Sequence, residues 1–513
     1  MTEDTYVGAV DQGTTGTRFI VFDHSGSVVA NAYEKHEQIY PEPGWVEHDP
    51  AEIWEKTKSV TTEALAKADL EPNDLEAIGI TNQRETTLLW DAESGTPVHN
   101  ALVWQDRRTT DRVEELQDEG MTEPIRDKTG LEVDAYFSAT KAEWLLENAD
   151  PIKMERTRPE DLRDRAEKGE ILMGTIDTWL IWKLTGNHIT DVTNASRTML
   201  YNIHDLEWDD ELVDEFGISE AMLPEVRPSS DEELYGHTDA EGFLEAEIPV
   251  AGALGDQQAA LFGQTCFDPG DAKNTYGTGS FFLMNTGEEA VASEHGLLTT
   301  IGFQRSGEPV QYALEGAIFI TGAAIEWLED MELIDSAQET ATLARNVDST
   351  DGVFFVPAFT GLGAPHWDGR ARGTIVGMTR GTRKEHIVRA TLESIAFQTR
   401  DVAEAMEADS GIEMTSLKVD GGAVKNNFLC QLQAGIIDTD IVRPVVDETT
   451  ALGSAYAAGL AVGYWDDPDS LRDNWQVDRE FEPDMDPDVA DRRHSRWQEA
   501  VDRSLDWARE DDE

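Results

Sequence analysis

A strand-like apolar run followed by a turn rich in glycine and threonine occurs twice in this 513-residue chain, once in each half. In the first half, Val7–Val10 leads into Asp11-Gln12-Gly13-Thr14-Thr15-Gly16-Thr17-Arg18, and the apolar run Phe19–Phe22 follows. In the second half, Asn274–Ser280 contains the turn Tyr276-Gly277-Thr278-Gly279-Ser280, again between apolar runs. Short glycine-containing turns between apolar runs are typical of β-hairpins. The repetition predicts two related domains, residues 1–251 and residues 252–513, with a cleft between them.

Helix and strand patterns alternate after each turn. Ile53–Ala68 has a helical period, and Ala77–Ile80 is an apolar strand that stops at the polar run Thr81–Glu85. In the second half, the strand Val250–Leu254 precedes a helix-like Ala259–Gly263. A further strand ends in the paired glycines of the sequence VDGGA, residues 419–423. This alternation predicts an α/β fold.

Three other segments have distinct compositions. The longest uncharged stretch, Thr449–Trp465, is shorter than the ~20 apolar residues that a membrane-spanning helix needs, so it predicts a buried helix. Asp150–Gly169 is highly charged and predicts a surface excursion. The acidic segment Asp484–Glu513 carries Trp497 and Trp507 at roughly helical spacing, which predicts a packed terminal helix.

The charge of the chain is strongly negative. The sequence has 41 Lys and Arg, of which only 13 are Lys, against 103 Asp and Glu, for a net charge of −62 and a pI near 4.3. Binding of nucleic acid or of an anionic membrane through a basic face is therefore excluded. Molar salt would screen the self-repulsion, because the Debye length falls from ~10 Å at 0.1 M to ~3 Å at 1 M. We expect a salt-rich cytoplasm; an acidic protein of an ordinary cell and a cation-binding surface are the alternatives.

The cysteines and the N-terminus indicate an intracellular protein. Cys266 and Cys430 are far apart and show no metal-ligand spacing, so they predict two reduced core thiols. The acidic start MTEDTYVGAVDQG lacks the basic and apolar regions of a signal peptide. We expect a protein of the cytoplasm.

The glycine- and threonine-rich turns predict a nucleotide site of an uncommon kind. The chain has neither G-x-x-x-x-G-K-[ST] nor G-x-G-x-x-G, which excludes a P-loop and a Rossmann fingerprint. The turn Asp11–Arg18 can instead cradle phosphate oxygens with its backbone N–H groups and hydroxyls. Asp11, at a strand end, is placed to hold Mg²⁺, which prefers oxygen ligands. Two such hairpins facing each other, with a Gly-Gly turn for adenosine, predict an ATP clamp of the actin/Hsp70 type.

Two other positions have both a structural and a functional interpretation. Asp256 begins the helix-like segment GDQQAALFG, where it is either an N-cap or a catalytic base. Arg84 and Glu85 follow an apolar strand directly. They form either a structural ion pair or a ligand-binding pair at the carboxyl end of the strand.

Thirteen segments between residue 8 and about residue 463 resemble glycerol kinases, within the carbohydrate kinase family of actin/Hsp70-like ATPases. The matching segments are GAVDQGTTGTR, PGWVEHDPAEIW, GITNQRETT, VWQDRRT, GTIDTWLIWKLTG, TNASRTML, GDQQAALFGQ, KNTYGTGSF, YALEGAIF, PAFTGLGAPHWD, RATLESIAFQTRDV, VDGGAVKNNFLCQ and TALGSAYAAGLAVG. They occur in the family's order along nearly the whole chain. The resemblance implies two α/β domains of the actin/Hsp70 (ribonuclease H-like) type with ATP bound between them.

The resemblance also implies roles for individual residues. The residues that would hold the glycerol hydroxyls are Arg84, Glu85, Tyr136, Asp256 and Gln257, and the walls of that site would be Trp104 and Phe281. Polar groups that fix hydroxyls, with aromatic faces that exclude water, suit a small polyol. The predicted nucleotide contacts are Thr14, Thr15, Gly16, Arg18, Thr278, Gly322, Glu326, Gly422 and Asn426. At Glu326 the chain departs from the family, because bacterial members carry Gln just before the Trp that is Trp327 here.

The activity implied is transfer of the ATP γ-phosphoryl group to glycerol, giving sn-glycerol 3-phosphate, with Asp256 as general base and Mg²⁺ beside Asp11. Another polyol or sugar kinase, and a non-catalytic actin-like or Hsp70-like ATP-binding protein, are the alternatives. Members of the family are usually dimers or tetramers, which implies a homo-oligomer. Many bacterial members are inhibited by fructose 1,6-bisphosphate through a Gly-Gly-Thr-Arg loop. The corresponding Asp239–Glu247 has four carboxylates and no Arg or Lys, so this inhibition is not expected.

Overall fold

The computed structural model describes residues 5–149 and 161–509. The N-terminal segment forms consecutive antiparallel strands β1 (Tyr6–Gln12), β2 (Gly16–Phe22) and β3 (Val28–Lys35). In this register Asp11 on β1 lies opposite Arg18 on β2, at the mouth of the turn between them. The hairpins predicted from the sequence are confirmed.

These strands belong to a six-stranded sheet with the order β13-β14-β5-β1-β2-β3. The added strands are β5 (Leu75–Asn82), β13 (Gly236–His237) and β14 (Pro249–Gly255), and β5 runs parallel to both β1 and β14. Alternate strand residues face opposite sides, so the sheet has two apolar faces. Helices α1 (Pro50–Ala68) and α6 (Ile176–Thr185) pack on one face, and α9 (Asp256–Gly263) and α14 (Thr449–Ala461) on the other.

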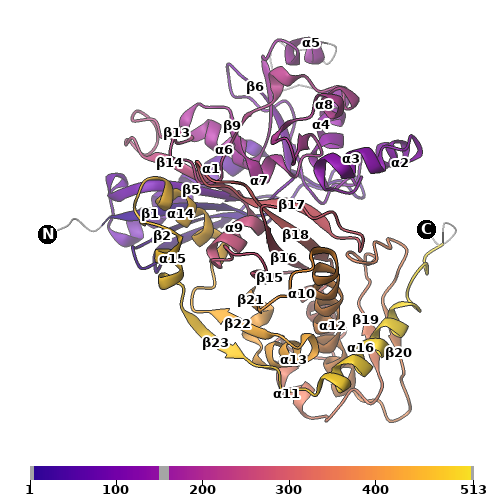
Figure 1. Cartoon of the computed structure of the whole chain (residues 1–513). Coiled ribbons are helices and arrows are strands. Elements are labelled where there is room, and N and C mark those ends of the chain that lie inside the picture. The colour runs from indigo at the N-terminus through magenta and orange to yellow at the C-terminus, as the bar shows by residue number, and fades with distance from the viewer. Residues whose placement is uncertain (1–4, 150–160, 510–513) are drawn as a thin grey trace.

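The second half repeats this arrangement in a seven-stranded sheet with the order β17-β18-β16-β15-β21-β22-β23. Strand β15 is antiparallel to β16 and parallel to β21, as β1 is to β2 and β5. The bounds are β15 (Ala272–Tyr276), β16 (Ser280–Gly287), β17 (Leu298–Phe303), β18 (Gln311–Ile318), β21 (Ser416–Gly421), β22 (Asp440–Pro444) and β23 (Val477–Phe481). Two related domains are therefore confirmed. Figure 1 shows α9 and the yellow α14 between the two sheets, although α14 comes from the C-terminal half.

The predicted domain boundary, between Ala251 and Gly252, lies inside β14, a strand of the first sheet. Helices α12 (Lys384–Ser410), α13 (Asn427–Ile437) and α16 (Pro487–Val501) complete the core of the second half. Trp497 on α16 is buried as predicted, whereas Trp507 lies beyond the helix end and is 65% exposed, so its predicted packing is wrong. Helix α16 ends at Val501, and Leu505 in the following turn still packs against the core of the second half.

A smaller four-stranded sheet, β4-β7-β6-β8, extends the first half. Its strands are β4 (Glu47–His48), β6 (Thr87–Asp91), β7 (Ala101–Leu102) and β8 (Ile171–Thr175), and its neighbouring helices are α2 (Thr110–Asp118), α3 (Thr122–Thr129), α4 (Ser138–Asn148) and α5 (Leu162–Ala166). The remaining elements are β9 (Ile189–Asp191), α7 (Val192–Ala195), β10 (Tyr201–Asn202), β11 (Glu207–Trp208), α8 (Asp210–Glu215), β12 (Glu225–Arg227), α10 (Gly322–Asp330), α11 (Glu339–Arg345), β19 (Phe354–Val356), β20 (Thr374–Val376) and α15 (Pro468–Asn474).

Three simpler expectations can be compared with this fold. Both cysteines are buried and free, as predicted. The expected surface excursion Asp150–Gly169 lies largely outside the described residues, and its described part contains the short helix α5. In the ranges 5–149 and 161–509, no helix combines the length and the apolar character that crossing a membrane requires.

Candidate active site

The turn between β1 and β2 brings four predicted nucleotide residues together: Thr14, Thr15, Gly16 and Arg18. The Gly13 N–H donates to Gly16 O at 3.0 Å and closes the turn. A side chain at Gly16 would collide with the backbone, because a Cβ there would lie 2.5 Å from Glu34 O. The Thr14 hydroxyl accepts a hydrogen bond from the Trp104 indole at 2.9 Å, which connects this turn to a predicted wall of the polyol site.

The turn between β15 and β16 holds Thr278 and lies against the start of α10. The Gly277 N–H donates to Gly279 O at 2.8 Å, and the Gly322 N–H donates to Gly277 O at 3.1 Å. A Cβ at Gly322 would lie 2.5 Å from that same carbonyl, so only glycine fits. The structure therefore brings Thr278 and Gly322 together. Glu326 lies one turn further along α10 and is exposed.

The VDGGA turn follows β21 and meets the end of β15, where the Gly422 N–H donates to Tyr276 O at 3.1 Å. A Cβ at Gly422 would have no neighbour within 4 Å, so the space beside it is open. Asn426 is the N-cap of α13, and its Oδ1 accepts from the backbone of residues 428 and 429. Its Nδ2 donates to the Thr340 hydroxyl at 3.1 Å. The Asn426 side chain is thus held by structural partners beside an open glycine turn.

Arg84, Glu85 and Asp256 meet where β5 and β14 end side by side. Glu85 has a φ of 62°, in the left-handed region that non-glycine residues seldom adopt. This backbone interrupts the alternation of a strand, so that two consecutive charged side chains are buried in the same place. The Nε of Arg84 lies 3.3 Å from Asp256 Oδ1 and 3.7 Å from Glu85 Oε1. The predicted ligand-binding pair of Arg84 and Glu85 therefore contacts the predicted base, Asp256, through Arg84.

Asp256 opens α9, and its carboxylate is the most accessible of this group, with 31% of the side chain exposed. Burial raises the pKa of Asp256, and the nearby positive charges of Arg84 and Lys273 oppose that rise. Its Oδ1 accepts a hydrogen bond from the Gln257 N–H at 2.8 Å. A carboxylate that is oriented by a backbone donor and stays accessible can act as a general base.

Gln257 and Phe281 are the other predicted polyol-site residues from the C-terminal half of the chain. The Gln257 Oε1 accepts from Lys273 Nζ at 2.6 Å, which leaves the amide NH₂ of Gln257 to donate elsewhere. Burial lowers the pKa of Lys273 to about 8. The Phe281 ring lies 5.7 Å from the Arg84 guanidinium. On the N-terminal side, the rings of Trp104 and Tyr136 meet edge to face at 5.6 Å.

Asp11 lies in a markedly negative environment. Burial raises the pKa of Asp11 to about 6; Arg18 lowers it, and the charges of Glu448 and Asp256 raise it further. Glu448, just before α14, is ion-paired with Arg18. In the part of the chain that the structure describes, no cluster of three His, Cys, Asp or Glu side chains could enclose a metal. Mg²⁺ commonly binds one or two carboxylates together with phosphates and waters, so the Asp11 environment fits that ion.

Sequence reasoning missed four charged partners in this region: Arg197, Lys273, Glu315 and Glu448. Arg197 lies after α7, Lys273 on β15 and Glu315 on β18, and all three are fully buried. The detectable signal was a charged residue inside an apolar run, as for Glu315 in YALEGAIF. A buried charge needs a partner, and Arg197, Lys273 and Glu315 all lie in segments that resemble the family, whereas Glu448 lies just before one.

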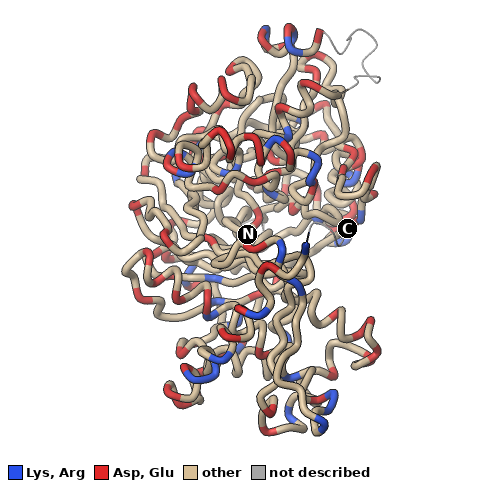
Figure 2. Tube along the Cα trace, turned by 90° about the vertical axis from the view of Figure 1, so that its right-hand side faces the viewer, with Lys and Arg blue, Asp and Glu red and all other residues tan. Residues whose placement is uncertain are grey.

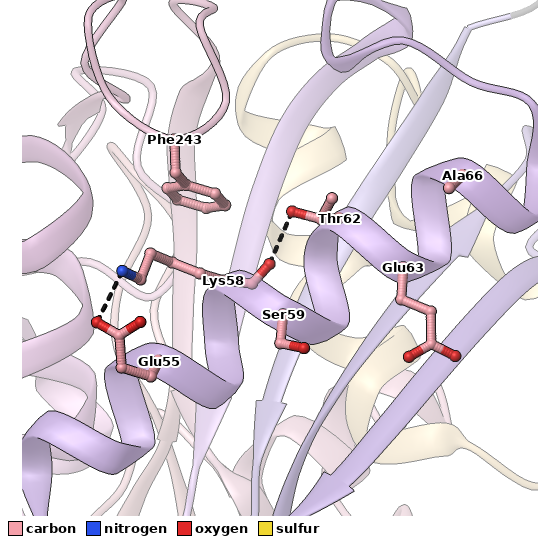
Figure 3. Close-up of a pocket in the computed structure, with 7 residues that line it drawn as sticks. All are labelled: Glu55, Lys58, Ser59, Thr62, Glu63, Ala66 and Phe243. Atoms are coloured by element: carbon pink, nitrogen blue, oxygen red, sulfur yellow. Dashed lines mark hydrogen bonds and ion pairs between the residues drawn. The ribbon is translucent and has the colours of Figure 1, made fainter.

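A groove on the surface of the described residues lies away from these groups. It has a volume of about 480 Å³ and runs along α1 beneath Phe243 (Figure 3). Lys58 in this groove is ion-paired with Glu55 at 2.7 Å. None of the predicted site residues lines it. The candidate active site is therefore defined by converging polar groups at the strand ends and not by this groove.

Comparison with known proteins agrees with the architecture. The N-terminal domain model of the FGGY family of carbohydrate kinases matches residues 6–263, and the C-terminal domain model matches residues 272–462. The chain therefore belongs to the FGGY family of carbohydrate kinases.

Individual relatives indicate which kind of carbohydrate kinase this chain is most similar to. The chain is 78% identical to glycerol kinase from the halophilic archaeon Haloarcula marismortui, over 99% of this chain and 100% of that protein. It is also 78% identical to glycerol kinase from Haloferax volcanii, over 100% of both. A crystal structure of Plasmodium falciparum glycerol kinase with ADP superposes with a TM-score of 0.91 at 38% identity and covers 98% of both chains. A gluconate kinase from Lactobacillus acidophilus, with a TM-score of 0.84 at 22% identity, shares the fold.

Proposed function

We propose that this chain is a glycerol kinase, which transfers the γ-phosphoryl group of ATP to glycerol and releases sn-glycerol 3-phosphate and ADP. The observation that carries the proposal is the junction of Arg84, Glu85 and Asp256 at the ends of β5 and β14. Identity of 78% to two glycerol kinases over their full lengths supports the same substrate. This reaction is the first step of glycerol catabolism.

In this proposal the polar groups around Asp256 hold the three hydroxyls of glycerol. Each hydroxyl both donates and accepts, so it needs an acceptor such as Glu85 and a donor such as Arg84 or the Gln257 amide. The hydroxyl of Tyr136 supplies a further contact. The rings of Trp104 and Phe281 cover the carbon chain and exclude water that would otherwise compete for the phosphoryl group.

Asp256 is the proposed general base. Its carboxylate accepts the proton of the terminal hydroxyl while that oxygen forms a bond to the γ-phosphorus and the bond from phosphorus to the bridging β,γ-oxygen breaks. The electron pair of the broken bond remains on ADP. Phosphoryl transfer passes through a loose transition state, so positioning and charge stabilisation supply most of the catalysis. The N–H donor of Gln257 and the Arg84 guanidinium keep the Asp256 carboxylate oriented.

The two glycine- and threonine-rich turns are the proposed phosphate and nucleotide sites. Thr14, Thr15, Gly16 and Arg18 would contact the β- and γ-phosphates, and Thr278, Gly322, Glu326, Gly422 and Asn426 the rest of the nucleotide. Arg18 would exchange its partner Glu448 for phosphate oxygens. Mg²⁺, when bound beside Asp11, would supply neutralisation of the phosphate charge. We place the domain boundary near residue 251, with most glycerol and phosphate contacts in the first domain and the catalytic Asp256 and the other nucleotide contacts in the second.

The proposed setting is the cytoplasm of an organism with high internal salt, with the protein acting as a homo-oligomer, a dimer or a tetramer. No nucleic acid or membrane partner is needed for this reaction. The test is ADP production by the purified protein with glycerol, xylulose and gluconate, each with ATP and Mg²⁺ in molar KCl. We expect turnover with glycerol at least tenfold above that with the two sugars. Preference for xylulose or gluconate would indicate another kinase of the family, and no turnover with any of them would contradict the proposal.

A further inference from the structure

Two arginines and two glutamates form a closed ring of ion pairs next to Asp256. Arg84 binds Glu315 through Nη1 at 2.5 Å and through Nη2 at 2.9 Å. Arg197 lies 3.1 Å from Glu315 Oε1 and donates through Nε to Glu85 Oε1 at 2.7 Å. The ring closes between Arg84 and Glu85 at 3.7 Å. Each of the four side chains is at most 1% exposed.

The ring is electrically neutral, and each member depends on the others. Burial opposes ionisation of Glu315, but the charges of Arg197 and Arg84 outweigh burial and lower its pKa to about 2. Glu315 is therefore ionised at any ordinary pH. Removal of one charge from a buried set of this kind leaves an uncompensated charge in a medium of low dielectric constant.

The ring determines which atoms remain available to a ligand. Glu315 and Gln258 take three N–H groups of the Arg84 fork, so the Nε edge of Arg84 is turned toward Asp256. Both arginines approach the Oε1 atom of Glu85. Among the described residues, the Oε2 atom of Glu85 has no hydrogen-bond partner. A donor edge and a free acceptor therefore lie beside the accessible carboxylate of Asp256, in the combination that adjacent hydroxyls require.

We propose that Glu315 and Arg197 are positioning residues that hold Arg84 and Glu85 in the orientation needed to bind a polyol, and so contribute to substrate selectivity. The proposal rests on the proposed function. Glu315 belongs to β18 of the seven-stranded sheet, whereas the other three residues belong to the first half of the chain. The polyol-binding groups are therefore fixed across the junction of the two domains.

A purely structural role is the competing explanation, and the chain offers a matched control. Glu393 on α12 is 2% exposed and is also held by two arginines, Arg389 at 2.9 Å and Arg493. Its partners belong to α12 and α16. Arg389 also packs on the Phe428 ring and Arg493 on the Phe397 ring, and among the described residues neither arginine is paired with a predicted site residue. Glu393→Gln therefore causes the same chemical loss as Glu315→Gln without touching the ring.

The experiment compares Glu315→Gln with Glu393→Gln in the full-length protein in molar KCl, measuring the KM for glycerol, the KM for ATP and the melting temperature. We expect Glu315→Gln to raise the KM for glycerol at least tenfold while the KM for ATP changes less than threefold. Glu393→Gln should lower the melting temperature and leave both KM values within threefold. Equal increases in both KM values for Glu315→Gln, or a glycerol KM within threefold of wild type, would overturn the proposal.

Arg197→Lys keeps the charge of the ring but removes the planar fork that binds two glutamates at once. This variant serves if Glu315→Gln does not fold. Its KM for glycerol should rise at least fivefold with the KM for ATP unchanged, and an unchanged KM for glycerol would refute the positioning role. The comparison of substrates with the wild-type protein separates the proposed function from the proposed positioning role. If wild type prefers another polyol, the proposed function fails, and the selective KM effect is then measured with that polyol.

Discussion

Asp256 is the residue whose chemistry is tested most directly. Asp256→Asn keeps the size of the side chain and an oxygen that can face the Gln257 N–H, but it removes the proton acceptor. We expect kcat to fall by at least ~10²-fold, the lower range for loss of a general base, with a smaller change in the KM for glycerol. Steady-state kinetics at saturating ATP measure this. A variant that keeps more than about half of the wild-type kcat would show that another group accepts the proton.

The contacts of Arg84 depend on the planar shape of its guanidinium. Its fork binds both oxygens of Glu315 while its Nε faces Asp256, and a lysine ammonium reproduces neither geometry. Arg84→Lys should therefore raise the KM for glycerol by at least tenfold and more than the KM for ATP. The KM for glycerol and the KM for ATP are measured on the same preparation of the variant. Equal changes in the two constants would place Arg84 outside the polyol site.

Sequence reasoning identified the candidate residues but not what holds them. Arg84, Glu85 and Asp256 stand out because polar residues directly follow apolar strands, and that signal is local. Glu315 lies 231 positions from its partner Arg84, and Arg197 lies 112 positions from its partner Glu85. Only the pairing of β18 with the second sheet, and the packing of that sheet against the first, brings Glu315 to Arg84. No local pattern contains that information.

At the scale of elements, the segment Asp239–Glu247 packs against α1. The Phe243 ring meets the Trp54 ring edge to face at 5.5 Å, and Leu244 is buried. The neighbouring pocket also contains two basic groups, Lys58 and Lys183. Tertiary packing supplies these lysines from α1 and α6, which the local sequence of the segment does not reveal.

We still expect no inhibition by fructose 1,6-bisphosphate. Lys58 is neutralised by Glu55, and the segment itself carries four carboxylates that repel phosphate. The measurement is the initial rate at saturating glycerol and ATP with the bisphosphate raised to millimolar levels at constant ionic strength and free Mg²⁺. Saturable inhibition that Lys58→Gln and Lys183→Gln abolish would show that these lysines form an anion site.

The larger helices and strands were predicted from the sequence, and the smallest strands were not. The hairpins of each half and the helices α1, α9 and α14 correspond to clear apolar patterns. The sheet β4-β7-β6-β8 was not predicted. Two of its strands, β4 and β7, have two residues each, and so short a strand has no detectable period. Their pairing depends on the surrounding fold.

At the scale of the whole molecule, the charge of −62 is distributed over both domains (Figure 2). Removing salt lengthens the range of repulsion between these carboxylates. We expect the melting temperature and the activity to fall on dialysis from molar KCl to ~0.01 M salt, with recovery when KCl is restored. Thermal melting at a series of KCl concentrations measures this. A melting temperature that does not change with KCl would refute adaptation to high salt and leave the proposed kinase activity untouched.

Three glycines allow direct backbone contact in the seam where α14 meets α9 and strand β5. A Cβ at Gly453 would lie 1.8 Å from Ala259 O, and one at Gly263 would lie 2.0 Å from Thr449 O. A Cβ at Gly79 on β5 would lie 2.1 Å from the backbone oxygen of Ser454. Backbones this close cannot move apart to admit a methyl group without shifting a helix, and close-packed interiors resist such shifts.

This seam limits what a map of tolerated substitutions can reveal. Such a map, selected on growth with glycerol, should reject even alanine at Gly79, Gly263 and Gly453 as strictly as it rejects changes at Asp256. None of the three glycines has a side chain that could touch a substrate. Positions that tolerate no replacement will therefore include these closely packed glycines as well as the reacting groups. Thermal melting of each variant will distinguish the two kinds of position.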